Sequence, residues 1–299
     1  MNTNLFIRML SVFLCLAMTG CPNLIQKSNQ EYIDGLNALK ANQPAEAITF
    51  FDISIEKSPK FELAWIGRGE SYIRLLNFQE AEKSFDQAIE INPHNLEAFR
   101  GRGESYLGQK RWKEAIDDFN FVLKEKPKEI FVLANRGFAY NALEQYSEAL
   151  NDLTICIEEK PNNPSFYCNR GIIYQKMGEY DLALSDLSKA IELEPQNASY
   201  FAIRGKIYAD SGLWDKSIVD YTESIQKDLN SFNGYKYRGL YFKHLGDWQS
   251  ALTDLTRAIQ INPQDADCYF ERAGIYQQLN EAEKATADLD VYQTLTTPN

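Results

Sequence analysis

A recurrence every 34 residues constrains this chain more than any other feature. Written in rows of 34 from position 28, eight rows run to the C-terminus without an insertion. One column holds an arginine in seven consecutive rows: Arg68, Arg102, Arg136, Arg170, Arg204, Arg238 and Arg272. The next column holds glycine in the first seven rows, and each row up to the seventh closes on a proline except at Leu229. Self-similarity at a fixed period predicts an array of stacked units.

The spacing within a row predicts two closely packed helices. Tyr72 follows Gly69 by three residues and Trp65 precedes it by four, so on a helix the two bulky side chains flank a position with no side chain. A second helix can therefore approach the first closely at the glycine. The proline that closes a row, such as Pro93, ends the second helix because it cannot donate a backbone hydrogen bond.

The period, the aromatic–Gly–Tyr spacing and the closing proline resemble the tetratricopeptide repeat (TPR), over residues 28–297. A further matching column is alanine except at Ser217: Ala47, Ala81, Ala115, Ala149, Ala183, Ala251 and Ala285. The resemblance implies an all-α fold, a right-handed α-solenoid superhelix of eight helix–turn–helix hairpins. The array would occupy residues 28–299, with repeats that start near 28, 62, 96, 130, 164, 198, 232 and 266.

The arginine column departs from the commoner TPR pattern, in which a leucine-like residue precedes the glycine. Six of the seven arginines have an aspartate sixteen residues later, on the expected second helix, while Arg68 faces Ser84. We expect an ion pair between the two helices of each hairpin. The predicted pairs are Arg102–Asp118, Arg136–Asp152, Arg170–Asp186, Arg204–Asp220, Arg238–Asp254 and Arg272–Asp288. The alternative, an arginine ladder for an anionic ligand, is less favoured because the aspartates neutralise it.

Residues 1–20 are typical of a secretory leader, with Arg8 followed by an apolar run over 9–17. The run is shorter than the ~20 residues that span a bilayer. Met18-Thr19-Gly20-Cys21 resembles the lipobox of bacterial lipoproteins, which implies cleavage before Cys21, lipidation of its sulfur and a lipidated tether over 21–27. Pro22, rather than an aspartate, follows the cysteine, which favours the outer membrane, facing the periplasm, over the inner membrane. The alternative is a leader cut elsewhere, with Cys21 an ordinary residue.

The sequence offers little for catalysis or metal binding. Two histidines and five cysteines form no ligand-like cluster, so we expect no metal, no cofactor and no enzymatic activity. Cys156 and Cys168 lie on successive expected helices, where buried thiols are a better interpretation than a disulfide. A net charge of −11 repels phosphate backbones and argues against a nucleic-acid partner.

The TPR resemblance also implies a binding surface, because in TPR proteins the first helices line a concave groove that holds peptides. Transferred by column, the predicted groove residues are Ile66, Glu70, Ile73, Arg100, Glu104, Phe131, Phe138, Asn141, Ile172, Gln175, Lys206, Lys236 and Lys243. This groove would be apolar in its first half and basic toward its C-terminal half, which suits a ligand with a hydrophobic segment followed by acidic residues. The alternative is that Ile66, Phe138 and Ile172 pack against neighbouring helices and the lysines are ordinary solvated charges.

Together these patterns predict a lipid-anchored scaffold of the bacterial cell envelope that binds peptide segments of other envelope proteins in its groove. The alternative is a self-associating structural lipoprotein that forms a homodimer through its last helix or its groove.

Overall fold

The computed structural model describes residues 22–297, with side chains from Gln30 onward, and these residues form helices and no strands. The expected leader and Cys21 lie outside the described residues. The helices are α2 (Pro22–Lys40), α3 (Pro44–Lys57), α4 (Glu62–Arg74), α5 (Phe78–Ile91), α6 (Leu96–Gly108), α7 (Trp112–Glu125), α8 (Ile130–Ala142), α9 (Tyr146–Glu159), α10 (Pro164–Lys176), α11 (Tyr180–Leu193), α12 (Ala198–Asp210), α13 (Trp214–Lys227), α14 (Phe232–Leu245), α15 (Trp248–Ile261), α16 (Ala266–Gln278) and α17 (Ala282–Thr296).

Each even-numbered helix is the first helix of a hairpin, and from the second row on it begins at the residue where the 34-residue period puts the row start. The first row differs, because α2 begins at Pro22. Residues 22–27, expected as a tether, therefore belong to the first helix. Proline is well accepted in the first turn of a helix, and no proline follows within α2 to interrupt it.

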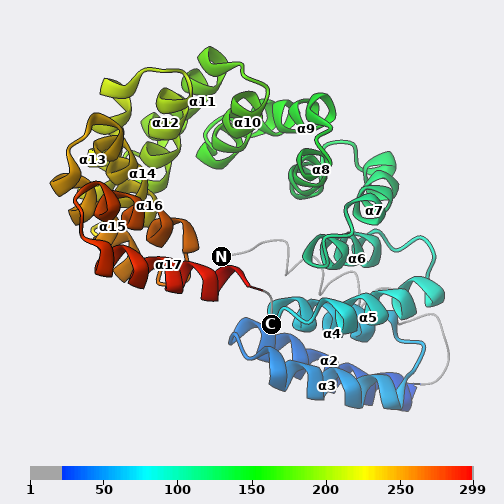
Figure 1. Ribbon diagram of the computed structural model, residues 1–299. Helices are drawn as coiled ribbons and strands as arrows, with labels where there is room; N and C mark the ends of the chain where they lie inside the picture. The colour runs from blue at the N-terminus through cyan, green and yellow to red at the C-terminus, as the bar shows by residue number, and fades with distance from the viewer. Residues whose placement is uncertain (1–21, 298–299) are drawn as a thin grey trace. The chain divides into compact units, whose positions relative to one another are not determined.

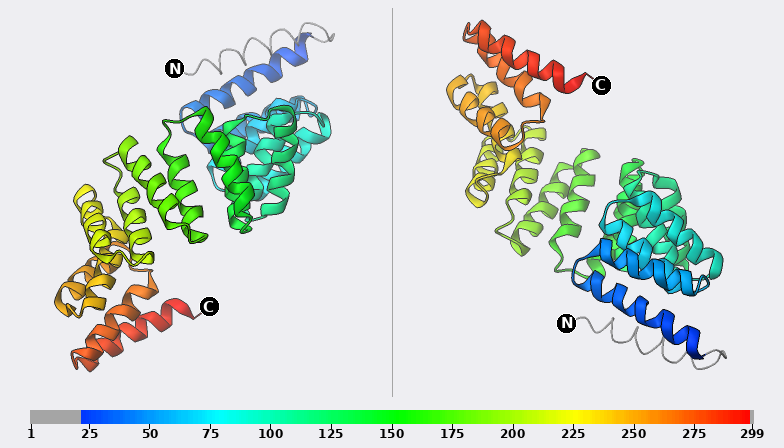
Figure 2. Two further views of the ribbon diagram at one scale, coloured as in Figure 1. Left: turned by 90° about the horizontal axis from the view of Figure 1, so that it is seen from above. Right: turned by 90° about the horizontal axis from the view of Figure 1, so that it is seen from below.

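The chain divides into two compact units, residues 1–152 and 153–299, with the boundary inside α9. In the first unit each hairpin packs on the next: α4 contacts its partner α5 and also the next first helix, α6 (Figure 1). The second unit repeats this arrangement, with α12 against α13 and α14. Two further views show its successive hairpins, coloured from green to red (Figure 2). Within each unit, successive first helices therefore form one continuous layer.

The turn inside each hairpin depends on one residue with left-handed backbone geometry. Gly178, Gly212 and Gly246 hold this position in three hairpins of the second unit, with φ between 77° and 79°, and Asn280 holds it in the last hairpin at φ 59°. In the first unit the position falls to residues with side chains, among them Leu76 at φ 58°. Left-handed geometry is free of steric cost only for glycine, so the more strained turns are those of the first unit and of the last hairpin.

Close contact at the glycine column builds the core. Phe85 of α5 is fully buried, and its ring would lie 2.7 Å from a Cβ added at Gly69 of its own hairpin. The same ring also fills the space beside Gly101 of the next hairpin. One side chain thus packs against two successive first helices, and any larger residue at either glycine would displace it.

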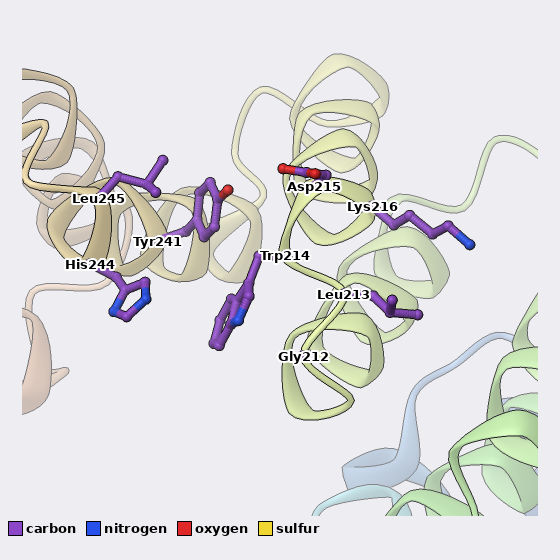
Figure 3. Close-up of a pocket in the computed structure, with 8 residues that line it drawn as sticks. All are labelled: Gly212, Leu213, Trp214, Asp215, Lys216, Tyr241, His244 and Leu245. Carbon is purple, nitrogen blue, oxygen red and sulfur yellow. The ribbon is translucent and has the colours of Figure 1, made fainter.

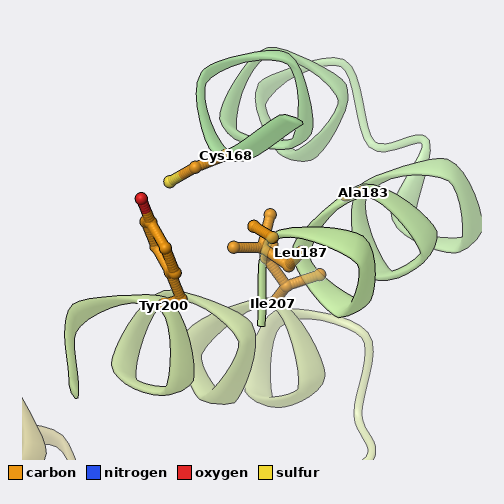
Figure 4. Close-up of a cluster of buried hydrophobic side chains, with 6 residues drawn as sticks. Cys168, Ala183, Leu187, Tyr200 and Ile207 are labelled. Atoms are coloured by element: carbon orange, nitrogen blue, oxygen red, sulfur yellow. The ribbon is translucent and has the colours of Figure 1, made fainter. Parts of the chain in front are cut away.

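In the second unit Leu187 takes the same role beside Gly171, within a buried cluster that includes Cys168, Ala183, Tyr200 and Ile207 (Figure 4). Cys156, Cys168 and Cys268 are buried thiols, as the sequence predicts for Cys156 and Cys168. Burial raises the pKa of the Cys168 thiol to about 11, so it stays protonated and unreactive near neutral pH.

Candidate functional site

The arginine column lies between the helices of each hairpin, and the structure forms all six predicted Arg–Asp pairs. In each pair Nε and Nη2 of the arginine donate to the two carboxylate oxygens of the aspartate, at 2.6 to 2.9 Å. Such two-point contacts fix orientation as well as charge. The hydrogen bonds to Asp118 raise the pKa of Arg102 further above its usual range.

Each of these arginines also reaches back to the second helix of the preceding hairpin, a contact that the sequence analysis missed. Nη1 donates to the residue sixteen positions earlier, at 2.6 to 3.3 Å; the acceptors, in chain order from Arg102, are Asp86, Asn120, Thr154, Ser188, Thr222 and Thr256. Arg68 follows the same pattern with Asp52 at 3.0 Å, and its Nε donates to Ser84. The acceptors share one repeat column, sixteen residues before each arginine. That column was the sequence feature from which this second contact could have been predicted.

Aromatic rings complete the surroundings of the arginines. The guanidinium of Arg102 lies 5.3 Å from the Phe99 ring and 5.7 Å from the Tyr106 ring. With its three nitrogens bonded to protein carboxylates and its faces near rings, this group has little left to offer a ligand. The arginine column is therefore a structural clasp, and the binding surface lies elsewhere on the first helices.

In the first unit, the exposed parts of three successive first helices form a surface that we name the α4–α6–α8 face, defined by Glu70, Arg100, Glu104, Phe131 and Phe138. Phe131 and Phe138, both on α8, are 44% and 55% exposed. Arg100 lies with Nη2 3.8 Å from Oε1 of Glu70 and with its guanidinium 5.6 Å from the Phe131 ring. Trp112 meets the Phe138 ring edge to face at 5.8 Å.

Glu104 is a half-buried acid of this face. Burial raises the pKa of its carboxyl, Arg100 opposes that rise, and the nearby charge of Glu70 adds to it. The face therefore holds two carboxylates and one guanidinium beside two exposed aromatic rings. The rings offer apolar area to a partner, and the charged groups beside them are of both signs.

Three other predicted groove residues of the first unit lie at different depths. Ile66 is only 4% exposed and packs with Phe85 in the core, so its assignment to a ligand-accessible groove was wrong. Ile73 is half-buried against the same cluster, and Asn141 is also half-buried. Ile66 is buried because its side chain lies in a cluster with residues of α5 and α6, including Ala81, Phe85 and Ala98.

In the second unit, the corresponding surface, the α10–α16 face, carries the three predicted lysines, and each is already paired. Lys206 contacts Asp210 at 2.9 Å, Lys243 contacts Glu271 at 2.5 Å, and Lys236 contacts Asp265 at 2.9 Å and Asp267 at 3.2 Å. Lys236 is also buried.

The expected basic half is therefore wrong, because carboxylates of the same or the next first helix neutralise the lysines. Gln175 also donates to Asp210, at 2.6 Å. Ile172 is half-buried against the cluster around Leu187. In place of free cations, this face has one large exposed aromatic that sequence reasoning missed, Phe270, which is 50% exposed and lies 5.1 Å from the Tyr292 ring. Phe270 occupies the repeat column of Arg100, so extending the transfer to the last row would have found it.

A shallow pocket of about 400 Å³ lies in the second unit, at the start of α13 and the end of α14 (Figure 3). Trp214 stacks against Tyr241 and His244, with ring centroids 5.9 and 5.4 Å apart. The lining residues are Gly212, Leu213, Trp214, Asp215, Lys216, Tyr241, His244 and Leu245. Sequence reasoning missed this pocket. The feature that could have indicated it is Leu213, an apolar residue in a column where other rows carry Asn77, Arg111 or Glu179. Charges of both signs line it, so it favours no one class of ligand.

Within residues 22–297, no group of three or more His, Cys, Asp or Glu side chains is placed to hold a metal ion. No helix in that range combines the length and the apolar composition that a membrane span requires.

Stacked helical hairpins, joined by a repeated internal clasp and carrying an exposed face on their first helices, define an α-solenoid repeat protein. Family models match three stretches: the tetratricopeptide repeat at residues 66–130 and at 164–197, and the TPR repeat at 137–178. The chain is a tetratricopeptide repeat protein.

Solved structures support the same fold. A tetratricopeptide repeat protein from Parabacteroides merdae ATCC 43184 superposes with a TM-score of 0.69 and 18% identity, over 83% of this chain and 98% of that one. PilW, a type IV pilus biogenesis factor, gives 0.63 and 21%, over 68% and 94% of the two chains. YrrB, described as a TPR protein with an unusual peptide-binding site, gives 0.52 and 23%, over 62% and 95%. The comparison with curated proteins gave no match.

Proposed function

We propose that this protein is a protein-interaction scaffold that binds a peptide segment of another protein on its α4–α6–α8 face. The observation that carries the proposal is the exposure of Phe131 and Phe138, two helical turns apart on α8 and beside Arg100. Single exposed apolar residues are ordinary, whereas aromatic side chains grouped with an arginine are the residue types that contribute most to binding at interfaces. The peptide-binding site in the description of YrrB and the pilus role of PilW are consistent with this function.

The test compares two matched sets of exposed phenylalanines. Proteins crosslinked to the wild-type chain in cells would be purified and compared with those from Phe131→Ala/Phe138→Ala and from Phe270→Ala, with circular dichroism as the check on folding. We expect a specific partner to be lost in the double variant and kept in Phe270→Ala, whose ring is equally exposed but lies on the α10–α16 face. Equal recovery of that partner by all three proteins would refute the proposed site.

The scaffold would act at a membrane. The lipobox-like Met18-Thr19-Gly20-Cys21 supports a lipid anchor at Cys21, and Pro22 favours the outer membrane, facing the periplasm, with other envelope proteins as partners. Stable anchoring requires about two acyl chains, which a lipoprotein cysteine carries on its sulfur. Because α2 begins at Pro22, the anchor would join directly onto the first helix of the array.

The anchor is tested by Cys21→Ala. Cells that express each form would be grown with a radiolabelled fatty acid and then fractionated. We expect the wild type to carry the label and to sediment with membranes, and the variant to lose the label. Unlabelled wild-type protein would contradict the anchor and leave the binding face to be judged on its own test.

A further inference from the structure

We infer that one face of the last helix, α17, binds an α-helix of another protein that carries an arginine on its apolar side. We name this face the C-terminal surface and define it by Thr286, Leu289, Asp290, Tyr292 and Gln293. It belongs to the second unit, whereas the α4–α6–α8 face belongs to the first, so the inference goes beyond the proposed function.

The first argument is that the other rows show which kind of element packs on a second helix. Leu289 continues a repeat column whose other seven members are at most 2% exposed: Phe51, Phe85, Phe119, Leu153, Leu187, Tyr221 and Leu255. The next first helix covers such a residue, as α6 covers Phe85 at Gly101. Leu289 is only half-buried, and no described helix follows α17. A helix is therefore the element that fits against the C-terminal surface.

The second argument is an acceptor that no arginine of the chain uses. Asp290 continues the column whose seven earlier members accept a hydrogen bond from Nη1 of the next arginine, and it comes after the last arginine of the array. Two of those acceptors are also aspartates: Asp52 pairs with Arg68 at 3.0 Å, and Asp86 pairs with Arg102 at 2.8 Å. Asp290 is exposed and forms no ion pair within residues 30–297. An arginine on the bound helix would complete this column.

The third argument is how the last row departs from its columns. Tyr292 stands where the other rows have a small buried residue such as Ala88 or Ser224, and its ring lies 5.1 Å from the exposed ring of Phe270. Gln293 stands where all seven other rows have isoleucine or leucine. An aromatic centre with a polar margin is typical of interfaces that are exposed to water in the free protein. The C-terminal surface therefore suits a partner that binds and dissociates.

A second copy of this chain does not supply the arginine. In a head-to-tail assembly the first row would stack on α17, and the first row has Asp34 in the arginine column. Asp34 and Asp290 would then oppose each other, and like charges placed together are unfavourable. The charges disfavour extension of the array by its own copies and assign the C-terminal surface to a helix of a different protein.

The experiment uses the purified full chain in detergent and a phage-displayed library of helical miniproteins with one helix face randomised. Enriched binders are measured against the wild type, Asp290→Asn, Phe131→Ala/Phe138→Ala, and the control Asp181→Asn, which removes an exposed carboxylate of α11 in the same unit. Circular dichroism checks the folding of each variant. Binders that Phe131→Ala/Phe138→Ala loses are assigned to the α4–α6–α8 face. We expect the others to carry an arginine and to bind Asp290→Asn about tenfold more weakly than the wild type or Asp181→Asn.

A double-mutant cycle tests the contact itself. Replacing the arginine of an enriched binder by glutamine should weaken binding to the wild type about tenfold. The same replacement should have little further effect on binding to Asp290→Asn, because the ion pair is already absent there.

Several outcomes would overturn the inference. These are enriched binders without an arginine, equal affinity for Asp290→Asn and Asp181→Asn, or a library that gives binders of the α4–α6–α8 face alone. A wild-type dimer in sedimentation that Tyr292→Ala abolishes would assign the C-terminal surface to a second copy instead. None of these outcomes decides the proposed function, which has its own test at Phe131 and Phe138.

Discussion

Arg100 and Lys236 occupy the same column of the repeat, one in each unit, and their surroundings differ. Lys236 is buried and contacts Asp265 and Asp267 at the start of the next first helix, whereas Arg100 is half-exposed with Glu70 3.8 Å away. The start of the next first helix decides the difference, because there the lysine meets the helix-capping aspartate Asp265 and the arginine meets an exposed ring, Phe131. A cation in this column is thus part of the structure in one unit and part of the surface in the other.

The largest expected effect is the loss of stability when one arginine of an internal Arg–Asp pair is removed. Made in both units, this change tests whether the units differ only on the exposed faces of their first helices or also in their interiors. Arg136→Leu leaves the carboxylate of Asp152, with a side chain only 1% exposed, buried without its partner. We expect a loss of about 3–5 kcal/mol in the free energy of unfolding, measured by urea titration. Arg238→Leu, which deprives Asp254 in the second unit, should cost a similar amount.

A double variant serves as the control for this prediction. Arg136→Leu/Asp152→Leu removes both charges and should recover part of the loss, because the stranded carboxylate is gone. Simple addition of the two single losses would contradict the ion pair, and a much smaller effect for Arg238→Leu would show that the units differ in their cores as well.

A smaller loss of stability is expected in the repeat column of Arg100 and Lys236, where the surroundings of the cation differ between the two units. Lys236→Met removes the hydrogen bonds at 2.9 and 3.0 Å from its Nζ to Asp265, and we expect a loss of about 2 kcal/mol. Arg100→Met, in the matching column of the first unit, should cost less than about 0.5 kcal/mol, because its contact with Glu70 is long and partly solvated. Equal losses in thermal or urea unfolding would remove the distinction between a structural and a surface cation.

The smallest effect concerns pH. The folded protein raises the pKa of the Glu104 carboxyl, mainly by burial, so the favourable contribution of the protonated form is present at low pH and is lost as pH rises through the folded pKa. Glu104→Gln should therefore gain stability relative to the wild type at pH 7, and the gain should vanish near pH 3.5. Lys206→Gln, in the same column, should instead lose a few tenths of a kcal/mol at pH 7. A pH-independent effect of Glu104→Gln would show that its charge is not penalised.

The repeat columns were sufficient to predict the hairpins and the partners of the arginines, because both depend on residues at fixed spacing within the repeat. The row starts at Glu62, Leu96 and Ile130 coincide with helix starts for that reason. The faces were harder to predict, because they depend on residues that change from row to row. Lys236 looks free on its own helix, and only the position of Asp265, which caps the next first helix, reveals its pairing. Ile66 was assigned to the surface because its place in the repeat does not reveal how closely a neighbouring helix packs against it.

Because each arginine of the column bonds to the preceding row and not to the following one, the two ends of the array should respond differently when repeats are deleted. Each guanidinium bonds only to its own row and to the row before it, as Arg102 does with Asp118 and Asp86. When whole repeats are deleted from the C-terminal end, every remaining arginine therefore keeps all of its partners. When repeats are deleted from the N-terminal end, Nη1 of the first remaining arginine loses its acceptor in the preceding row. A truncation series built from the C-terminal side should lose stability in even steps, and the mirror series should carry one extra penalty at its new end.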